Sequence, residues 1–262
     1  MAFTKSQKDP VPEGPADGKP GFGVYVIRDS ARFHVLDNVI SFERESRDKF
    51  SYRREGPSGK VEKLISVRTG DLEIEIVPTH PIHTPSYKTD YMFLRLSKEI
   101  FVSRNSVTEF FLVVPIEVGL FFTGSEIREY FDIFSCKPDC SRYALYGQPE
   151  TGKLCKFARV VPNAHEQGPS SYVHGRLRVV VENELGVGAP IGRMVFPIRD
   201  HDVYYSGSLA AFDDLRMVLK ERMGLKIAEM VQQEGTGPAG WARSPRTTEK
   251  TSLKFSMEVG FD

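Results

Sequence analysis

The strongest constraint on the fold is an alternation of apolar and polar residues with a period of two. It is clearest at residues 71–77 (DLEIEIV), 176–182 (RLRVVVE) and 254–261 (KFSMEVGF). Successive side chains of a β-strand point to opposite faces, so each segment forms a strand with one buried face. Such half-buried strands are typical of antiparallel sheets. The alternation therefore predicts an all-β protein.

Two longer stretches need separate interpretation. Residues 109–122 (EFFLVVPIEVGLFF) are apolar on both faces, which indicates a central strand, and Pro115 predicts a break or bulge within it. Residues 213–233 have a composition that suits a helix. However, their apolar residues also alternate, and Met223-Gly224 can form a tight turn. We favour a hairpin there.

Two segments rich in proline and glycine separate parts of the chain. Residues 1–20 are rich in proline, glycine and charge, which predicts a disordered tail. The proline-rich segment 77–85 separates an amino-terminal β domain (21–80) from a larger unit (86–262), which contains a Gly/Pro-rich loop at 234–251. We predict a small antiparallel sheet domain packed on a larger antiparallel β-sandwich.

Charge and composition disfavour several kinds of partner. Thirty-five basic residues balance 35 acidic ones, and residues 43–63 mix both signs, so we expect no nucleic-acid binding. The most apolar stretch is too short to span a membrane. Three cysteines are too few for a disulfide framework, and the amino end has no apolar stretch of signal-peptide length, so we expect a cytoplasmic protein.

Residues 145–154 (LYGQPETGKL) match part of the phosphate-binding loop pattern, with Gly147, Gly152 and Lys153 in place. The pattern ends in a hydroxyl residue that holds Mg²⁺, and here that position is Leu154. The following residues are strand-like and end at Pro162 instead of opening a helix. We interpret the segment as a hairpin turn and expect no nucleotide cofactor.

His80 and His83 have a spacing that metal ligands sometimes use, and Cys136, Cys140 and Cys155 could complete a zinc site. The cysteines show no matching second pair. We therefore interpret the histidines as residues of a proline-rich linker and the cysteines as small hydrophobic residues, and we expect no metal.

Asp200, His201 and Asp202 are adjacent, and Asp213 and Asp214 follow closely. Carboxylates around a histidine can bind a cation or perform acid–base chemistry. Adjacent residues of a strand point to opposite faces, so the triplet converges only in a loop. We interpret it as a solvated turn and assign no catalytic residue.

Trp241 lies in a polar loop with Arg243 and Arg246. Exposed tryptophan and arginine are the residue types that anchor protein interfaces, so we predict that these three residues bind a partner. The alternative is that the indole folds back over a sheet edge and covers it.

The "PIEVG" strand at 115–119, the "RYALYGQPETG" segment at 142–152 and a proline-rich junction before a "Y-x-F-L-x-L" strand support one family resemblance. The chain resembles domain-of-unknown-function family 432, over about residues 70–205 and more weakly throughout. The resemblance implies an archaeal, intracellular protein with no assigned activity. It supplies no catalytic residues.

These observations favour a non-enzymatic binding or scaffold protein, as a subunit or regulator of a larger assembly with a protein partner; a homo-oligomer is left open. The alternative is a small hydrolase or lyase whose His and Asp groups converge from loops at one end of the sandwich. Carbohydrate binding through exposed aromatic residues also suits a sandwich, but no residue here is specific to it, and fold alone does not decide function. An enzyme should gather these groups in one cleft, whereas a scaffold should expose apolar residues or a strand edge.

Overall fold

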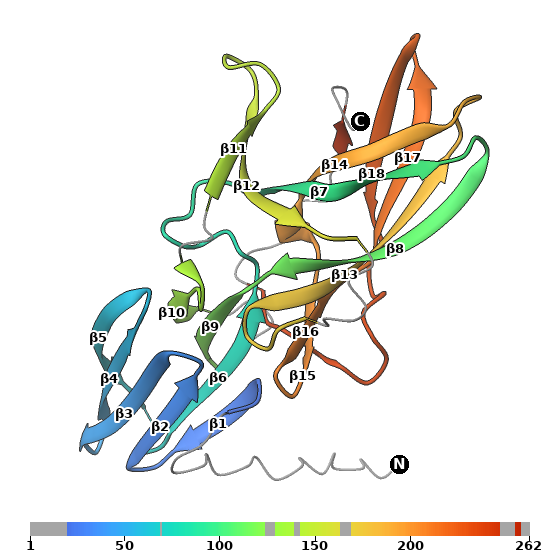
Figure 1. The fold of residues 1–262 in the computed structure, drawn as a ribbon. Helices are drawn as coiled ribbons and strands as arrows, with labels where there is room; N and C mark the ends of the chain where they lie inside the picture. The colour runs from blue at the N-terminus through green and yellow to red at the C-terminus, as the bar shows by residue number, and fades with distance from the viewer. Residues whose placement is uncertain are drawn as a thin grey trace, which may run out of the picture.

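The structure is a computed structural model that describes residues 20–68, 70–123, 129–138, 142–162, 169–246 and 255–257. The expected disordered tail lies outside these residues except for Pro20, and Cys140 also lies outside them. Of the predicted last strand, only Phe255–Met257 is described. The described chain forms four sheets, which we call sheets I to IV (Figure 1).

Sheets I and II contain antiparallel pairs only. Sheet I has the order β1 (Gly23–Ile27), β6 (Leu72–Thr79), β9 (Glu117–Phe122), β10 (Tyr130–Phe134). Sheet II is a meander of β2 (Ser30–Val35), β3 (Asn38–Ser46), β4 (Lys49–Gly56) and β5 (Gly59–Ser66). Sheet I joins strands from both sides of the 77–85 segment, and the domain boundary near residue 80 stays a prediction.

Sheets III and IV combine antiparallel and parallel pairs. Sheet III has the order β11 (Arg142–Tyr146), β12 (Lys153–Val160), β7 (Tyr91–Val102), β14 (Ala189–Pro197). Sheet IV has the order β19 (Ala242–Arg243), β15 (Val203–Ser206), β16 (Leu209–Phe212), β13 (His174–Asn183), β17 (Leu215–Arg222), β18 (Leu225–Gln232), β20 (Phe255–Met257), and β8 (Ser106–Pro115) also pairs with β13. The β12–β7, β13–β16 and β13–β17 pairs are parallel. The prediction of antiparallel sheets is therefore correct for most of the described pairs but not for these.

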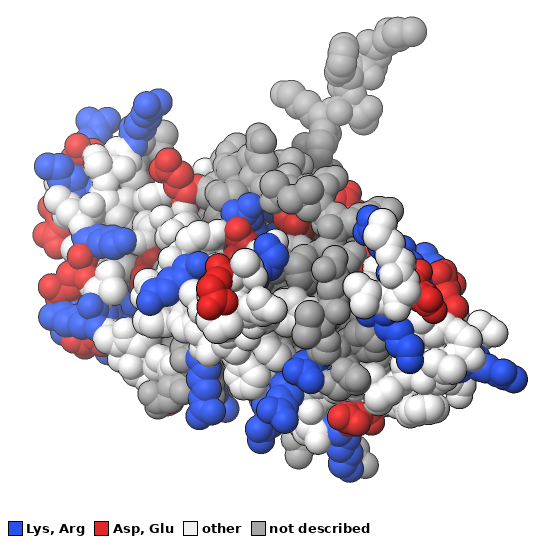
Figure 2. All heavy atoms as spheres, turned by 90° about the horizontal axis from the view of Figure 1, so that it is seen from above, with Lys and Arg blue, Asp and Glu red and all other residues white. Residues whose placement is uncertain are grey.

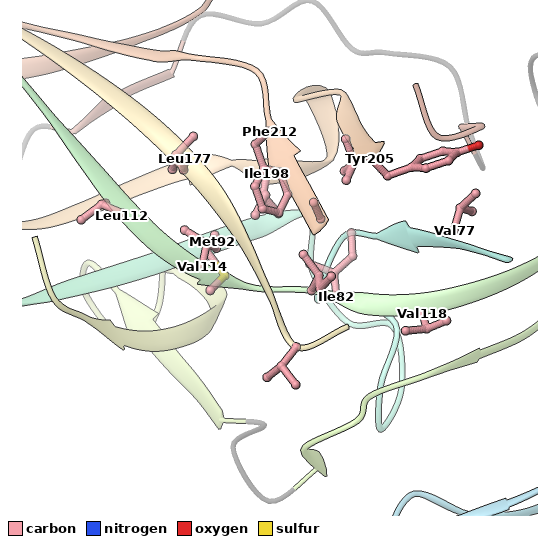
Figure 3. Packing of buried hydrophobic residues seen from close by; sticks show 14 of the residues in the cluster. Val77, Ile82, Met92, Leu112, Val114, Val118, Leu177, Ile198, Tyr205 and Phe212 are labelled. Atoms are coloured by element: carbon pink, nitrogen blue, oxygen red, sulfur yellow. The ribbon is translucent and has the colours of Figure 1, made fainter. Parts of the chain in front are cut away.

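A continuous apolar core joins the sheets (Figure 3). Sheet I contributes Val77 and Val118, sheet III contributes Met92, and sheet IV contributes Leu112 and Leu177, all fully buried or nearly so. A single-turn 3₁₀ helix (Ile198–Asp200) connects β14 to β15. Within the described residues, no helix is both long enough and apolar enough to cross a bilayer. The all-β prediction is confirmed.

The apolar stretch at 109–122 supplies two strands in different sheets. The chain leaves sheet IV after Pro115, and β9 begins at Glu117 in the middle of sheet I, which confirms the break. The central-strand prediction is correct for β9 but wrong for β8, which pairs only with β13 among the described strands. Phe111, on the less buried face of β8, is partly covered because the Arg176 guanidinium lies 5.2 Å from its ring centroid.

Both predicted hairpins are confirmed. β17 and β18 pair from Leu215 opposite Gln232 to Arg222 opposite Leu225. The turn residues Met223 and Gly224 have φ values of 53° and 77°, as a two-residue hairpin turn requires. β11 and β12 pair across residues 147–152, so the segment that resembles a phosphate-binding loop is a turn between antiparallel strands.

Sheet II is covered with charges of both signs. Lys and Arg side chains lie among Asp and Glu side chains over this part of the molecule, at the left of Figure 2. Arg53 pairs with Glu55 on this surface, and each of the two side chains is 50% exposed. Arg54, the next residue, instead points inward to Asp132 of β10, and its side chain is 3% exposed. One buried ion pair therefore ties sheet II to sheet I.

Candidate functional site

The acidic residues near His201 are buried, so their interpretation as a solvated turn is wrong. Relative exposures are 5% for Asp200, 2% for His201, 4% for Asp202, 0% for Asp213 and 7% for Asp214. Burying carboxylates is unfavourable unless hydrogen bonds or ion pairs compensate, so the contacts of each group determine what it can do.

The Asp213 carboxylate accepts three hydrogen bonds from its own chain. They come from the backbone N of Asp202 (3.0 Å), the hydroxyl of Tyr204 (3.0 Å) and the backbone N of Thr236 (3.1 Å). Asp213 also donates its backbone N–H to the carbonyl oxygen of Asp202 at 3.0 Å. This arrangement holds the start of β15, the end of β16 and the 234–246 segment together.

Two other carboxylates of the group pair with arginines. Arg246 forms a bidentate ion pair with Asp202, in which Nε lies 2.7 Å from Oδ1 and Nη2 lies 2.8 Å from Oδ2. Arg243 Nη1 lies 3.6 Å from Oδ2 of the same carboxylate. Arg178 lies 2.8 Å from Asp214. Burial raises the pKa of Asp214, and the Arg178 charge opposes this shift. Asp202 and Asp214 therefore serve as ion-pair partners within the fold.

His80 contacts the triplet through the backbone. Its Nε2–H donates to the carbonyl oxygen of His201 at 2.6 Å, and burial lowers the pKa of His80 to about 4. The ring of His201 packs against Phe196 at a centroid distance of 5.2 Å. His80 thus reaches the backbone of His201, a contact between distant segments that the sequence did not predict.

His83 belongs to a second buried group, centred on Glu117 of β9. Its Nδ1–H lies 3.1 Å from Glu117 Oε2, and the other carboxylate oxygen accepts bonds from the backbone N (2.9 Å) and hydroxyl (2.6 Å) of Thr84. Lys156 donates to the carbonyl oxygen of Thr84, and burial lowers the pKa of this lysine. The interpretation of His80 and His83 as linker residues is therefore incomplete, because both side chains are tied into the core.

Cys136 and Cys155 are free, buried thiols, and burial raises the pKa of each to about 12. Cys140 lies outside the described residues. Among the described residues, no group of three His, Cys, Asp or Glu side chains is placed to hold a metal ion.

Sequence reasoning missed a row of three arginines on sheet III. Arg159 of β12 and Arg193 of β14 are both direct register partners of Arg95 of β7, and all three are exposed. The row lines a hollow of about 500 Å³. No local pattern could have revealed it, because the three residues become neighbours only through the strand pairing.

Comparison with known proteins places the chain in a family. The family model described as "Protein of unknown function (DUF432)" matches residues 21–258. The chain belongs to the DUF432 family. The predicted resemblance is thus confirmed, over a longer stretch than the residues that suggested it. No curated protein and no solved structure matches the chain.

In the DUF432 chain, the predicted partner-binding residues follow the edge of sheet IV. Ala242 and Arg243 form β19, which pairs with Tyr204 and Tyr205 of β15. Trp241 is partly buried, and its backbone N–H donates to the carbonyl oxygen of Pro238 at 3.2 Å. Arg243 and Arg246 contact Asp202, as described above. Partner binding by these three residues stays a prediction.

Apolar side chains are exposed at the opposite end of sheet IV of the DUF432 protein. Asn183 of β13 pairs with Ser106 of β8 and with Leu219 of β17, so the β7–β8 and β17–β18 turns lie at the same end. We call this end the distal end. The exposed apolar residues of this end and of the adjoining end of β7 in sheet III, with their relative exposures, are Phe101 (69%), Val107 (65%), Val187 (50%), Met223 (93%) and Leu225 (61%).

The β17–β18 hairpin projects beyond its neighbours at the distal end, at the upper right of Figure 1. β13 pairs with β17 only as far as Leu219, and β20 pairs with Ala228–Met230 of β18. Residues 221–226 therefore pair only with each other among the described strands, and all six are exposed.

Proposed function

We propose that this DUF432 protein is a non-enzymatic binding or scaffold module that holds a protein partner at the distal end of sheet IV. The observation that carries the proposal is the projecting tip at 221–226, which exposes Met223 and Leu225 between two strand edges. A two-stranded ribbon is marginally stable alone, and exposed strand edges and apolar residues attract other chains. A bound protein would cover both features.

The chemistry of the tip suits a protein surface. Methionine is flexible and polarizable, so it adapts to irregular apolar surfaces on a partner. Glu221, Arg222 and Lys226 surround the apolar pair with charges of both signs, which resembles the polar rim of a protein interface. A second copy of the chain and a different protein both fit this chemistry, and the experiment below separates them.

The buried carboxylates support a non-enzymatic role. Asp202, Asp213 and Asp214 already accept hydrogen bonds or ion pairs from their own chain. Two free buried thiols, Cys136 and Cys155, suit the reducing cytoplasm, which we propose as the location.

The alternative hydrolase or lyase function has one specific observation in its favour, the His83–Glu117 contact at 3.1 Å. A carboxylate that orients a histidine is a common element of acid–base catalysis. Hydrolysis of chromogenic ester or phosphoester substrates that disappears in His83→Gln would support this alternative, and it would contradict the non-enzymatic proposal.

The proposal is tested by native mass spectrometry of the protein purified gently from its own host. We expect a complex with a stoichiometric protein partner or a homodimer, and the measured mass of the complex distinguishes the two. The double variant Met223→Ser/Leu225→Ser should lose the complex. Leu64→Ser, which removes a leucine that is 63% exposed on sheet II, should retain it.

A monomer that carries a stoichiometric small molecule and no protein would contradict the proposal. So would equal loss of the complex in both variants, because the tip would then have no special role. Trp241→Ala provides a separate measurement, since it should weaken the complex only if the predicted anchor at 241–246 also contacts the partner.

A further inference from the structure

The three arginines of sheet III stand side by side across three neighbouring strands. Arg95 occupies the central position, with Arg159 on one side and Arg193 on the other. Residues directly opposite each other project to the same face of a sheet. Neighbouring strands lie about 4.8 Å apart, so the row extends over about 10 Å.

This arrangement is unfavourable without a ligand. Like charges directly opposite each other on a sheet repel and destabilise the pairing. Arg95 and Arg159 form no ion pair with any other described residue. Two neighbouring guanidinium groups without an ion-pair partner among the described residues, beside the third on Arg193, indicate a function for their combined charge.

An irregular pairing beside the row shapes the hollow. Ile191 of β14 pairs with Ile100 of β7, and Arg193 pairs with Arg95. One residue of β14 therefore lies between these two pairs, whereas four residues of β7 do. The extra residues of β7 form a bulge opposite Gly192. Bulges of this kind are frequent next to binding sites, because they redirect side chains.

The bulge supplies the other groups that line the hollow. Ser97 and Glu99 come from the bulge itself, and Phe93 lies two residues before Arg95 on the same face. A methyl group on Gly192 would lie only 3.2 Å from both Cγ and Oε1 of Glu99, so glycine leaves room for this carboxylate. The volume of about 500 Å³ is in the range of small-molecule sites.

We propose that the arginine row and the bulge form a binding site for a small phosphorylated molecule that also carries hydroxyl groups. A guanidinium presents parallel donors that match phosphate oxygens. Glu99 accepts hydrogen bonds and repels additional negative charge, so it favours hydroxyl groups next to the phosphate. A net charge of +0 gives no general attraction for nucleic acid, which favours a small ligand.

Titration calorimetry at low salt with ribose 5-phosphate, inorganic phosphate and ribose tests the proposal. Ribose 5-phosphate should bind at one site, and its affinity should fall as sodium chloride is added. Arg95→Gln should reduce its affinity by about tenfold or more, because a charge-assisted hydrogen bond is lost. Arg104→Gln, which removes an exposed arginine from the β7–β8 turn, should leave the affinity unchanged.

Two further comparisons decide the ligand class. Ribose 5-phosphate should bind more tightly than inorganic phosphate, and ribose alone should not bind. In Glu99→Gln, ribose 5-phosphate should bind no more tightly than inorganic phosphate, because its hydroxyl groups lose a charged acceptor. Thermal unfolding of each variant checks that it is folded, and Arg95→Gln should melt no lower than the wild type because a repulsion is removed.

The proposal is overturned if ribose 5-phosphate shows no saturable binding, or binds no more tightly than inorganic phosphate. Equal losses in Arg95→Gln and Arg104→Gln would also overturn it, because they would indicate a general charge effect. The outcome is independent of partner binding at the distal end, since none of these residues belongs to the 221–226 tip.

Discussion

Replacing Arg54 by methionine should destabilise the protein far more than the same change at Arg53. Arg54 Nε lies 2.6 Å from Asp132 Oδ2, and the two side chains are only 3% and 8% exposed. The guanidinium also donates to Ser58 Oγ at 2.9 Å and lies 4.7 Å from the Phe134 ring centroid. Methionine keeps most of the apolar contact with Phe134 but leaves the Asp132 charge buried.

The expected loss of stability depends on which hydrogen bonds Asp132 keeps in the Arg54 variant. Removing one partner of a buried ion pair costs about 3–5 kcal/mol. Asp132 keeps a hydrogen bond from the Tyr52 hydroxyl at 2.6 Å, so we expect a loss at the lower end, about 3 kcal/mol in the free energy of unfolding. Tyr52→Phe removes that single hydrogen bond instead and should cost about 1.5 kcal/mol.

Urea denaturation followed by tyrosine fluorescence or circular dichroism measures these free energies. Arg53→Met is the matched control, because Arg53 is the neighbouring residue of β4, is 50% exposed and forms ion pairs at the surface, where such pairs add little to stability. The double variant Arg54→Met/Asp132→Leu should be more stable than Arg54→Met, since it also removes the buried carboxylate that has lost its ion-pair partner. Similar losses at Arg53 and Arg54, or a double variant less stable than Arg54→Met, would refute the reasoning.

Three further predictions concern the buried groups. The pKa of His80 falls from 6.5 to about 4 on folding, so its neutral form stabilises the fold above pH 6.5 and this stabilisation is lost as the pH falls toward 4. His80→Asn should therefore flatten the dependence of the unfolding free energy on pH over this window, by up to about 3 kcal/mol, as denaturation at a series of pH values would measure. Arg246→Ala should cost about 2–3 kcal/mol in urea denaturation, because it leaves the Asp202 carboxylate buried, whereas Arg243→Ala, at 3.6 Å and 41% exposed, should cost about 0.5 kcal/mol. The buried thiol of Cys155 has its pKa raised to about 12, so iodoacetamide should label it only in denaturant, as peptide mass mapping would detect.

Sequence reasoning succeeded where the signal is local. The alternation at 176–182 gives the buried face of β13, and that at 71–77 gives the apolar face of β6. The second face of β6 was wrongly predicted to be exposed, because Glu75 and Val77 are buried where β6 lies inside sheet I. The turn at Met223-Gly224 was also predictable, since glycine readily adopts the positive φ that the turn requires. These features depend on residues that are near one another in the chain.

It failed where distant segments meet. Asp202 and Asp213 look solvated in the sequence because carboxylates usually are, and Arg246, Tyr204 and Thr236 provide the compensating contacts only in the folded chain. The arginine row depends on strand register, which alternation does not determine between different strands. Parallel pairing of β12 with β7 was likewise invisible, because parallel and antiparallel neighbours can share the same alternation.

The passage of the chain from β8 to β9 at Pro115 makes the molecule difficult to divide. Residues 106–115 belong to sheet IV and residues 117–122 belong to sheet I, and the amide of Ile116 between them donates to Val173 at 2.9 Å. Sheet I also needs β1 near the amino end, and sheet IV needs β18 near the carboxyl end. A fragment with all of sheet I must span residues 23–134, and one with all of sheet IV must span residues 106–257. Both need residues 106–134, so the chain cannot be cut into two pieces that each keep a complete sheet.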